Sequence, residues 1–94
     1  MDQELYSKVK YVIPGVLGID PGKITPELRF SDFGFGGGFD HKMIDLKMEL
    51  EEVFGVEISD EELEQFFEVR DVVNCIDTKD WRGVEEARRS EAGW

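Results

Sequence analysis

The side chains that could do chemistry in this 94-residue chain are few, and none has an evident catalytic neighbour. His41 is the single histidine, and the sequence around it offers no cysteine or serine for a nucleophilic pair. Cys75, the single cysteine, lies at helical spacing among Val72, Val73 and Ile76, which predicts a quiet core position without an internal disulfide. These patterns predict no catalytic residue, and we expect a protein that is not an enzyme.

Neither the acidic residues nor the glycines have the spacing of a metal or nucleotide site. Asp32 and Asp40 lack the alternating ligand positions of a calcium-binding loop, so no metal ligand is predicted. The glycine-rich segment 34–39 is not followed by the lysine and hydroxyl residue of a phosphate-binding loop. Recognition of another macromolecule is therefore a better hypothesis than binding of an ion or a nucleotide.

Negative charge is the strongest compositional signal. The 22 acidic and 11 basic residues give a formal net charge of −11, of which −10 lies before Asp77. Such a surface repels nucleic acid and anionic lipid and attracts basic partners. Solubility alone would also explain an acidic composition, so the placement of the charges has to decide between the two interpretations.

The length and the hydropathy of the chain predict one small domain outside the membrane. Ninety-four residues fit a single core, and no run of about 18 apolar residues is present. The first four residues lack the basic and apolar regions of a signal peptide. With only one cysteine, a reducing cytoplasmic location is the simplest expectation. We also expect a monomer.

Apolar periodicity predicts an all-α domain that begins with two longer helices. The first is expected over residues 5–17, with a kink at Pro14. The second is expected to start at the N-cap Asp40 and to end before Gly55. A long glycine-rich loop joins these helices, and four phenylalanines are expected to anchor it to the core: Phe30, Phe33, Phe35 and Phe39.

A short third helix and a longer fourth helix complete the predicted four-helix bundle. Ser59 and Glu62 form a capping-box pattern at the start of the third, and the fourth is expected over residues 69–76. The expected core consists of apolar residues from three helices: Val9, Ile13, Leu46, Leu50, Phe54, Val69, Val73 and Ile76. The domain is predicted to cover residues 1–77. Residues 78–94 form a charged tail, and the sequence leaves open whether it is helical or disordered.

The second helix shows two faces when its residues are placed 100° apart. Met43, Leu46, Leu50, Val53 and Phe54 form an ordinary core stripe. Ile44 and Met48 fall almost opposite this stripe, flanked by three acidic residues: Asp45, Glu51 and Glu52. An apolar pair within an acidic surface is typical of a small docking site, for which a basic partner would be complementary.

Several segments of the chain resemble acyl carrier proteins in order and spacing. The stretch 44–61 resembles the second helix of that family and its following loop, including the run Leu50-Glu51-Glu52 and then Phe54. Upstream, residues 17–19 and 24–27 resemble the end of the first helix and its loop. Asp32-Phe33-Gly34 resembles the Asp-Leu-Gly before the family's attachment site, and residues 69–76 resemble its last helix. The resemblance covers about four-fifths of the chain, from Leu5 to Ile76.

The resemblance implies a carrier fold whose second helix binds partner enzymes. The family's acidic and apolar recognition positions match Asp45, Ile44, Met48, Glu51 and Glu52. The implied partners are enzymes of acyl, lipid or polyketide metabolism that present a basic surface. In this family a serine at the start of the second helix carries phosphopantetheine through a phosphodiester.

The attachment position is where the chain departs from the family. Counting back from Asp45-Leu46, the Asp-Ser-Leu positions are held by Phe39, Asp40 and His41. A carboxylate cannot form that phosphodiester, and Ser31 is the only hydroxyl side chain between Thr25 and Ser59. No phosphopantetheine is therefore expected, although Asp40 could serve simply as a helix cap or could imitate a phosphate's charge.

Three hypotheses remain open at this point. The chain could be a serine-less homologue that docks without a covalent arm. It could instead be derived from a true carrier of fatty acid, polyketide or lipid biosynthesis, with Asp40 as an engineered or degenerate replacement. In the third, it is an acidic helical interaction module unrelated to acyl transfer.

Overall fold

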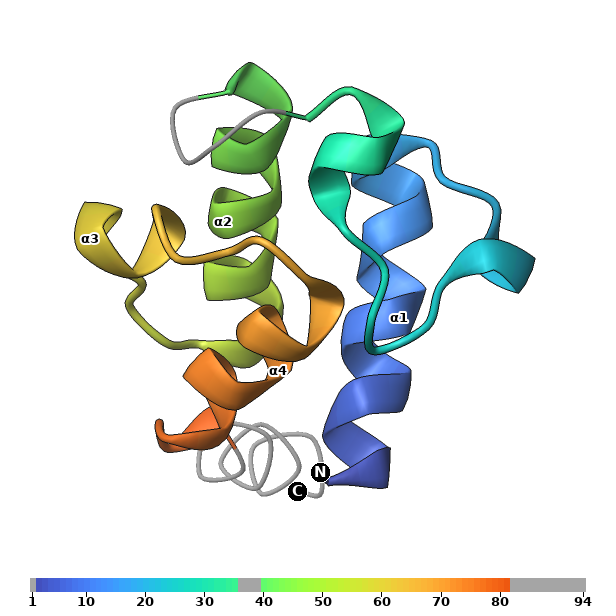
Figure 1. Ribbon diagram of the computed structural model, residues 1–94. Coiled ribbons are helices and arrows are strands. Elements are labelled where there is room, and N and C mark those ends of the chain that lie inside the picture. The colour runs from blue at the N-terminus through green and yellow to red at the C-terminus, as the bar shows by residue number, and fades with distance from the viewer. Residues whose placement is uncertain (1, 36–39, 82–94) are drawn as a thin grey trace.

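A computed structural model describes residues 2–35 and 40–81, and four α-helices and two short 3₁₀ segments make up its regular structure (Figure 1). The helices are α1 (Gln3–Leu17), α2 (His41–Phe54), α3 (Asp60–Leu63) and α4 (Val69–Asp77). The 3₁₀ segments η1 (Pro21–Lys23) and η2 (Phe30–Phe33) lie in the long connection between α1 and α2. The described residues contain no β-strand, only one isolated bridge between Arg29 and Glu68. The predicted all-α fold is confirmed.

Local sequence signals set most of the helix ends. Asp2 caps the start of α1, which continues through Pro14 to Leu17 and is capped at its end by Gly18 with a φ of 71°. Gly55 ends α2 with a φ of 64°, a left-handed conformation that favours glycine. Ser59 and Glu62 form the predicted capping box of α3. The four predicted helices are therefore present at the expected places.

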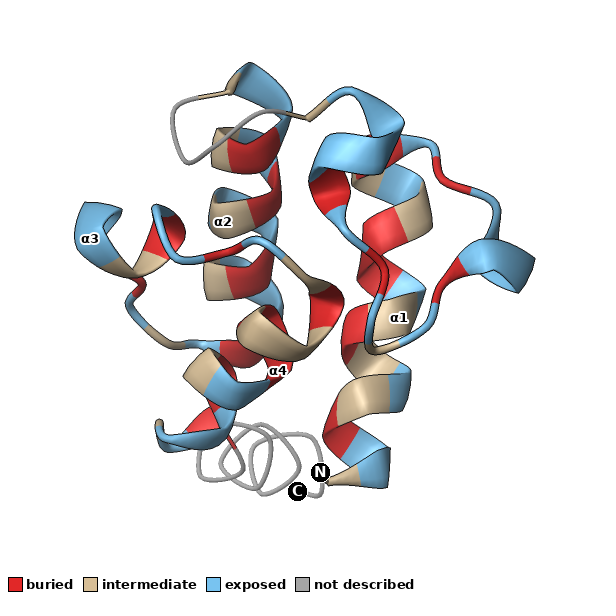
Figure 2. Ribbon diagram, in the orientation of Figure 1, coloured by how far each residue is buried: buried red, intermediate tan, exposed pale blue. Residues whose placement is uncertain are grey.

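The core lies where α1, α2 and α4 face one another, as the buried sides of these helices show in Figure 2. All eight residues predicted to build it are buried. Of the loop phenylalanines, Phe30 is buried and Phe35 is half-buried, whereas Phe33 is exposed and so was wrongly predicted as an anchor. Phe39 and the glycines 36–38 lie outside the described residues.

The packed core extends past the expected domain boundary at residue 77. Trp81 is buried, and its ring meets that of Phe54 edge to face, with the ring centroids 6.0 Å apart. The Lys8 ammonium lies 5.3 Å from the centroid of the Trp81 ring, a distance typical of a cation–π contact. Trp81 thus belongs to the helical domain, whereas the rest of the predicted tail, residues 82–94, lies outside the described residues.

Candidate partner-docking face

Asp40 occupies the N-cap of α2 and uses its carboxylate to hold the helix start. Its Oδ1 accepts a hydrogen bond from the backbone N–H of Lys42 at 2.8 Å. This bond satisfies one of the N–H groups that a helix start leaves without a partner, and the negative charge suits the positive end of the helix dipole. His41, the next residue, is exposed.

The face of α2 that points away from the core carries an apolar side chain between acidic ones. Met48 is 60% exposed, and Asp45 and Glu52 are exposed on either side of it along the helix. These three residues, called the α2 docking face below, are positioned by the burial of Leu46 and Leu50 on the opposite side of the same helix.

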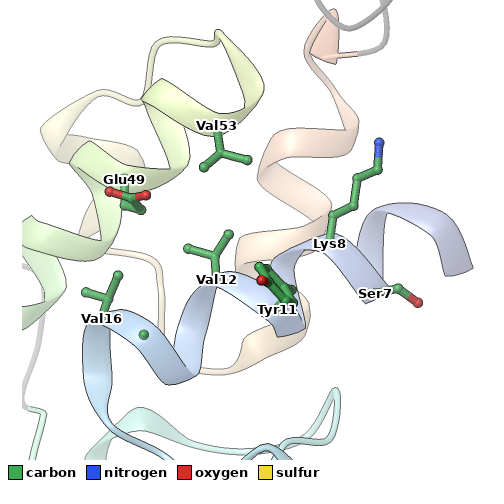
Figure 3. A pocket seen from close by; sticks show the side chains of 8 residues that line it. Ser7, Lys8, Tyr11, Val12, Val16, Glu49 and Val53 are labelled. Atoms are coloured by element: carbon green, nitrogen blue, oxygen red, sulfur yellow. The ribbon is translucent and has the colours of Figure 1, made fainter.

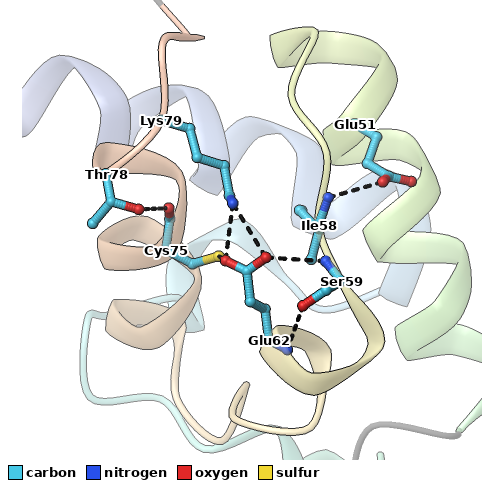
Figure 4. Close-up of polar contacts among 7 residues, drawn as sticks. All are labelled: Glu51, Ile58, Ser59, Glu62, Cys75, Thr78 and Lys79. Atoms are coloured by element: carbon cyan, nitrogen blue, oxygen red, sulfur yellow. Dashed lines mark hydrogen bonds and ion pairs between the residues drawn. The ribbon is translucent and has the colours of Figure 1, made fainter.

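Two of the five predicted partner-binding residues lie differently from the prediction. Ile44 is half-buried and packs against the core, so its placement on the outer surface opposite the core was wrong. Glu51 is also half-buried, and its Oε2 accepts a hydrogen bond from the backbone N–H of Ile58 at 2.9 Å (Figure 4). Glu51 therefore holds the segment that follows α2, a task that its position on a helical wheel does not reveal.

Sequence reasoning missed two further exposed residues of α2. Val53, predicted to lie in the core stripe, is 40% exposed, and Glu49 one turn before it is also exposed. Both line a groove between α1 and α2 (Figure 3). Val53 falls at the border of the core stripe, where the distance to the neighbouring helix decides whether a side chain is covered.

Four polar residues meet at a junction between α3 and α4: Ser59, Glu62, Cys75 and Lys79. The sequence alone did not predict that they would come together. The Glu62 carboxylate accepts from the Ser59 N–H at 3.0 Å and from the Cys75 thiol at 3.1 Å (Figure 4). The Lys79 ammonium lies 2.9 Å from the Oε2 of Glu62. The Ser59–Glu62 spacing was visible in the sequence, but Cys75 and Lys79 join only through the fold.

The contacts at this junction shift the pKa values of Glu62 and Cys75. The backbone hydrogen bond from Ser59, with the bonds from Lys79 and Cys75, lowers the pKa of Glu62 to about 2. Burial, helped by the nearby Glu62 carboxylate, raises the pKa of Cys75 to about 12. A thiol with so high a pKa is a poor nucleophile at neutral pH. Cys75 is half-buried and bonded to Glu62, so it is less enclosed than the predicted core position.

The described residues contain no group of three or more histidine, cysteine or acidic side chains able to hold a metal ion. Within the same residues, no helix combines the length and apolar character needed to cross a bilayer. An acidic helix face with one exposed apolar side chain can bind a basic partner around a shallow contact.

The fold is that of a small helical protein, and the relatives identify its family. The chain is 41% identical over 76 residues to the acyl carrier protein of Thermosynechococcus vestitus. These aligned residues make up 81% of this chain and 91% of that protein. It is 36% identical over 77 residues to the acyl carrier protein of Thermotoga maritima, covering 82% and 93%. No family model matches the chain. The chain belongs to the acyl carrier protein family.

Membership confirms the predicted family and gives the coarse function, that of an acyl carrier-like protein. Proteins of this family are carriers rather than enzymes, and they generally hold phosphopantetheine as a prosthetic group. The replacement of the attachment serine by Asp40, and the binding of partners by the α2 docking face, stay predictions.

Proposed function

We propose that this chain is an acyl carrier-like protein that docks through α2 on basic-surfaced enzymes of acyl or lipid metabolism, without a phosphopantetheine arm of its own. The observation that carries the docking part is the exposure of Met48 between Asp45 and Glu52. The proposal that the chain lacks phosphopantetheine depends on Asp40, which stands at the start of α2.

The charge of the chain and the shape of the face support docking. A formal net charge of −11 steers basic surfaces toward the protein, and charges at the rim of a contact chiefly raise the association rate. Met48 offers an apolar contact at the centre of the α2 docking face that a partner can cover. The role extends to Ile44 and Glu51 only as edges of the contact, since both are half-buried.

The residues at the start of α2 do not fit a covalently held phosphopantetheine. The group needs an alcohol for its phosphodiester, whereas Asp40 offers a carboxylate whose Oδ1 already accepts the Lys42 N–H. The described hydroxyl residue closest to it in the sequence is Ser31, which belongs to η2 on the far side of the glycine-rich segment. No step that uses the prosthetic group is therefore assigned to this chain.

Intact-mass spectrometry tests the missing arm. The purified chain is incubated with coenzyme A and a phosphopantetheinyl transferase, with a serine-bearing acyl carrier protein as the positive control. We expect the control to gain one phosphopantetheine and this chain to keep its mass. A gain by this chain, mapped to Ser31 or to any other residue, would overturn the proposal that it has no arm.

The variant Asp40→Ser separates the remaining hypotheses. Serine is also a good N-cap, so the variant should keep the start of α2. Modification of Asp40→Ser would mean that the transferase recognises the rest of the site, and would favour descent from a working carrier. If neither chain is modified and neither binds the transferase, the alternative of an acidic module unrelated to acyl transfer gains support.

A further inference from the structure

An apolar groove lies between α1 and α2, beside the α2 docking face but lined by other residues. Its volume is about 570 Å³. Figure 3 shows Val12 and Val16 of α1 pointing toward Glu49 and Val53 of α2, with Tyr11 at the edge. Over the described residues the groove is open to solvent, so part of another protein can enter it.

The exposed part of the α1 wall is an uncharged stripe that follows the helix. It consists of Ser7, Tyr11 and Gly15, spaced four residues apart. The Tyr11 side chain is 87% exposed, and tyrosine is among the residue types that contribute most at protein interfaces. A Cβ added to Gly15 would meet none of the described atoms beyond its own helical turn within 4 Å, so the backbone of a partner can approach α1 closely there.

Lys8, a cation near the N-terminal end of this wall, has partners within its own chain. Its ammonium lies 3.7 Å from the Oε1 of Glu4 and 5.3 Å from the centroid of the Trp81 ring. The neighbouring carboxylate offsets the charge of the ammonium, so Lys8 does not make the groove basic.

The α2 wall is acidic instead. Beyond Lys42 at the start of α2, the exposed charged residues of this helix are Asp45, Glu49 and Glu52, each about one turn from the next. Glu49 lines the groove itself, and Val53, one turn after it, adds an apolar side chain that is 40% exposed. The groove therefore has an uncharged wall on α1 and, on α2, a wall with carboxylates beside an apolar contact.

Such a groove suits an amphipathic helix with lysines or arginines on its polar side. An amphipathic helix lays its apolar residues into a groove and anchors them about one turn apart. From Ser7 to Val16 the α1 wall is about 13 Å long, the length of about two and a half helical turns. With its apolar residues against Tyr11 and Val53, the bound helix would place basic residues beside Glu49, where opposite charges attract.

A second copy of this chain suits the groove less well. Each copy carries a formal net charge of −11, and two such copies repel each other. A two-fold contact through this groove would also bring the Glu49 carboxylates of the two copies near each other. Charge therefore favours a basic partner over a second copy.

We propose that the groove between α1 and α2 binds a basic amphipathic helix of another protein, with the apolar side of that helix on Tyr11 and Val53 and its cations beside Glu49. The inference goes beyond the proposed function, because the residues that line the groove and those of the α2 docking face are different. It holds whether or not the α2 docking face binds an enzyme.

A synthetic peptide represents the partner helix in the first test. It consists of about 18 leucines and lysines, with the leucines at i, i+3, i+4 and i+7, and it is titrated into the isotope-enriched full chain. We expect NMR shift changes for the amides of residues 7–16 and 49–53. A peptide of the same composition in shuffled order cannot separate its apolar and basic sides, and it should bind about tenfold more weakly.

Substitutions of the apolar contacts provide the next comparison. Tyr11→Gln together with Val53→Gln removes apolar surface from exposed positions without changing charge, and should weaken peptide binding about tenfold. Phe67→Gln, at a residue that is 58% exposed and lies outside the groove, is the matched control and should leave the affinity unchanged.

A charge swap tests the acidic wall separately. Glu49→Lys should weaken binding of the leucine–lysine peptide about fivefold, and should strengthen binding of a matching leucine–glutamate peptide by a similar factor. Asp32→Lys changes the net charge equally at an exposed position in η2, outside the groove, and should alter either affinity by less than about twofold.

Several results would overturn the proposal. Shift changes that spread evenly over the acidic surface, or an affinity that ignores both groove variants, would mean that the peptide binds through overall charge. Changes confined to Met48 and its neighbours would rule out the groove while supporting the α2 docking face, so the two hypotheses fail separately. Groove amides that shift with the concentration of the chain alone would assign the groove to a second copy.

Discussion

Two acidic regions of this protein place the same residue types in different surroundings. On the α2 docking face, Asp45 and Glu52 are exposed around an apolar side chain and lie where a partner can reach them. At the junction of α3 and α4, the Glu62 carboxylate bonds a backbone N–H, a thiol and an ammonium group of its own chain. Exposed carboxylates suit the docking that we propose, whereas the bonded Glu62 carboxylate stabilises the fold, and a count of acidic residues cannot show this difference.

The largest expected difference in the free energy of unfolding is between substitutions on the buried and the exposed side of α2. Leu46→Ala removes a fully buried side chain and should lower the free energy of unfolding by about 2–5 kcal/mol, because it leaves a cavity. Met48→Ala should change it by less than about 0.5 kcal/mol, since Met48 is mostly exposed. Urea unfolding of both variants measures this difference.

Met48→Ala should act on binding instead. Loss of a covered apolar side chain should weaken a complex with phosphopantetheinyl transferase by about 1–2 kcal/mol, mainly through faster dissociation. Surface plasmon resonance measures the rate. If Met48→Ala unfolds as easily as Leu46→Ala and binds normally, Met48 belongs to the core and the docking hypothesis fails.

Charge reversal on the α2 docking face is the next largest expected effect. Asp45→Lys with Glu52→Lys should slow association with the same transferase about tenfold at low salt, and the difference should shrink as salt screens exposed charges. Glu51 is left unchanged, because its carboxylate also holds the Ile58 N–H.

The control for charge reversal keeps the same change in net charge. Asp32 and Asp77 are exposed and lie outside α2, so their replacement by lysine should affect association much less. Equal slowing by both double variants would mean that overall charge steers the partner and that α2 offers no particular surface.

The smallest expected effect is on the free energy of unfolding when Glu62 at the junction of α3 and α4 is replaced, and this effect should depend on pH. Glu62→Gln removes charge-assisted bonds from a side chain that is 35% exposed, and should cost about 1 kcal/mol at pH 7. The pKa of Glu62 is about 2 in the folded protein against an ordinary 4.5, so folding favours the ionised carboxylate. Its stabilisation is thus complete above about pH 4.5 and is lost as the pH falls toward 2.

Chemical unfolding at several pH values measures this dependence. The difference in unfolding free energy between the native chain and Glu62→Gln should shrink between pH 4.5 and pH 2. Glu61→Gln, an exposed neighbour in the same helix turn, should differ from the native chain by less than about 0.5 kcal/mol. A constant difference for Glu62→Gln across this range would contradict the internal role of the carboxylate.

The sequence by itself determined the helices, most of the core and the family. Helix ends depend on neighbouring residues, so Asp40, Gly55 and the Ser59–Glu62 box could be recognised from local patterns. The centre of an apolar stripe is buried whatever the exact helix spacing, which is why Leu46 and Leu50 were predicted correctly. Order and spacing over most of the chain likewise sufficed for the resemblance to acyl carrier proteins, which the relatives confirm.

The tertiary structure decided what lies at the borders of those stripes and which distant residues meet. Periodicity gives the direction of a side chain from its own helix axis, but the packing distance to the next helix decides that Val53 is exposed and Ile44 half-buried. The bond from Cys75 to Glu62 and the burial of Trp81 join segments that are separate in sequence. Such contacts depend on how the helices are arranged in space, which no local pattern encodes.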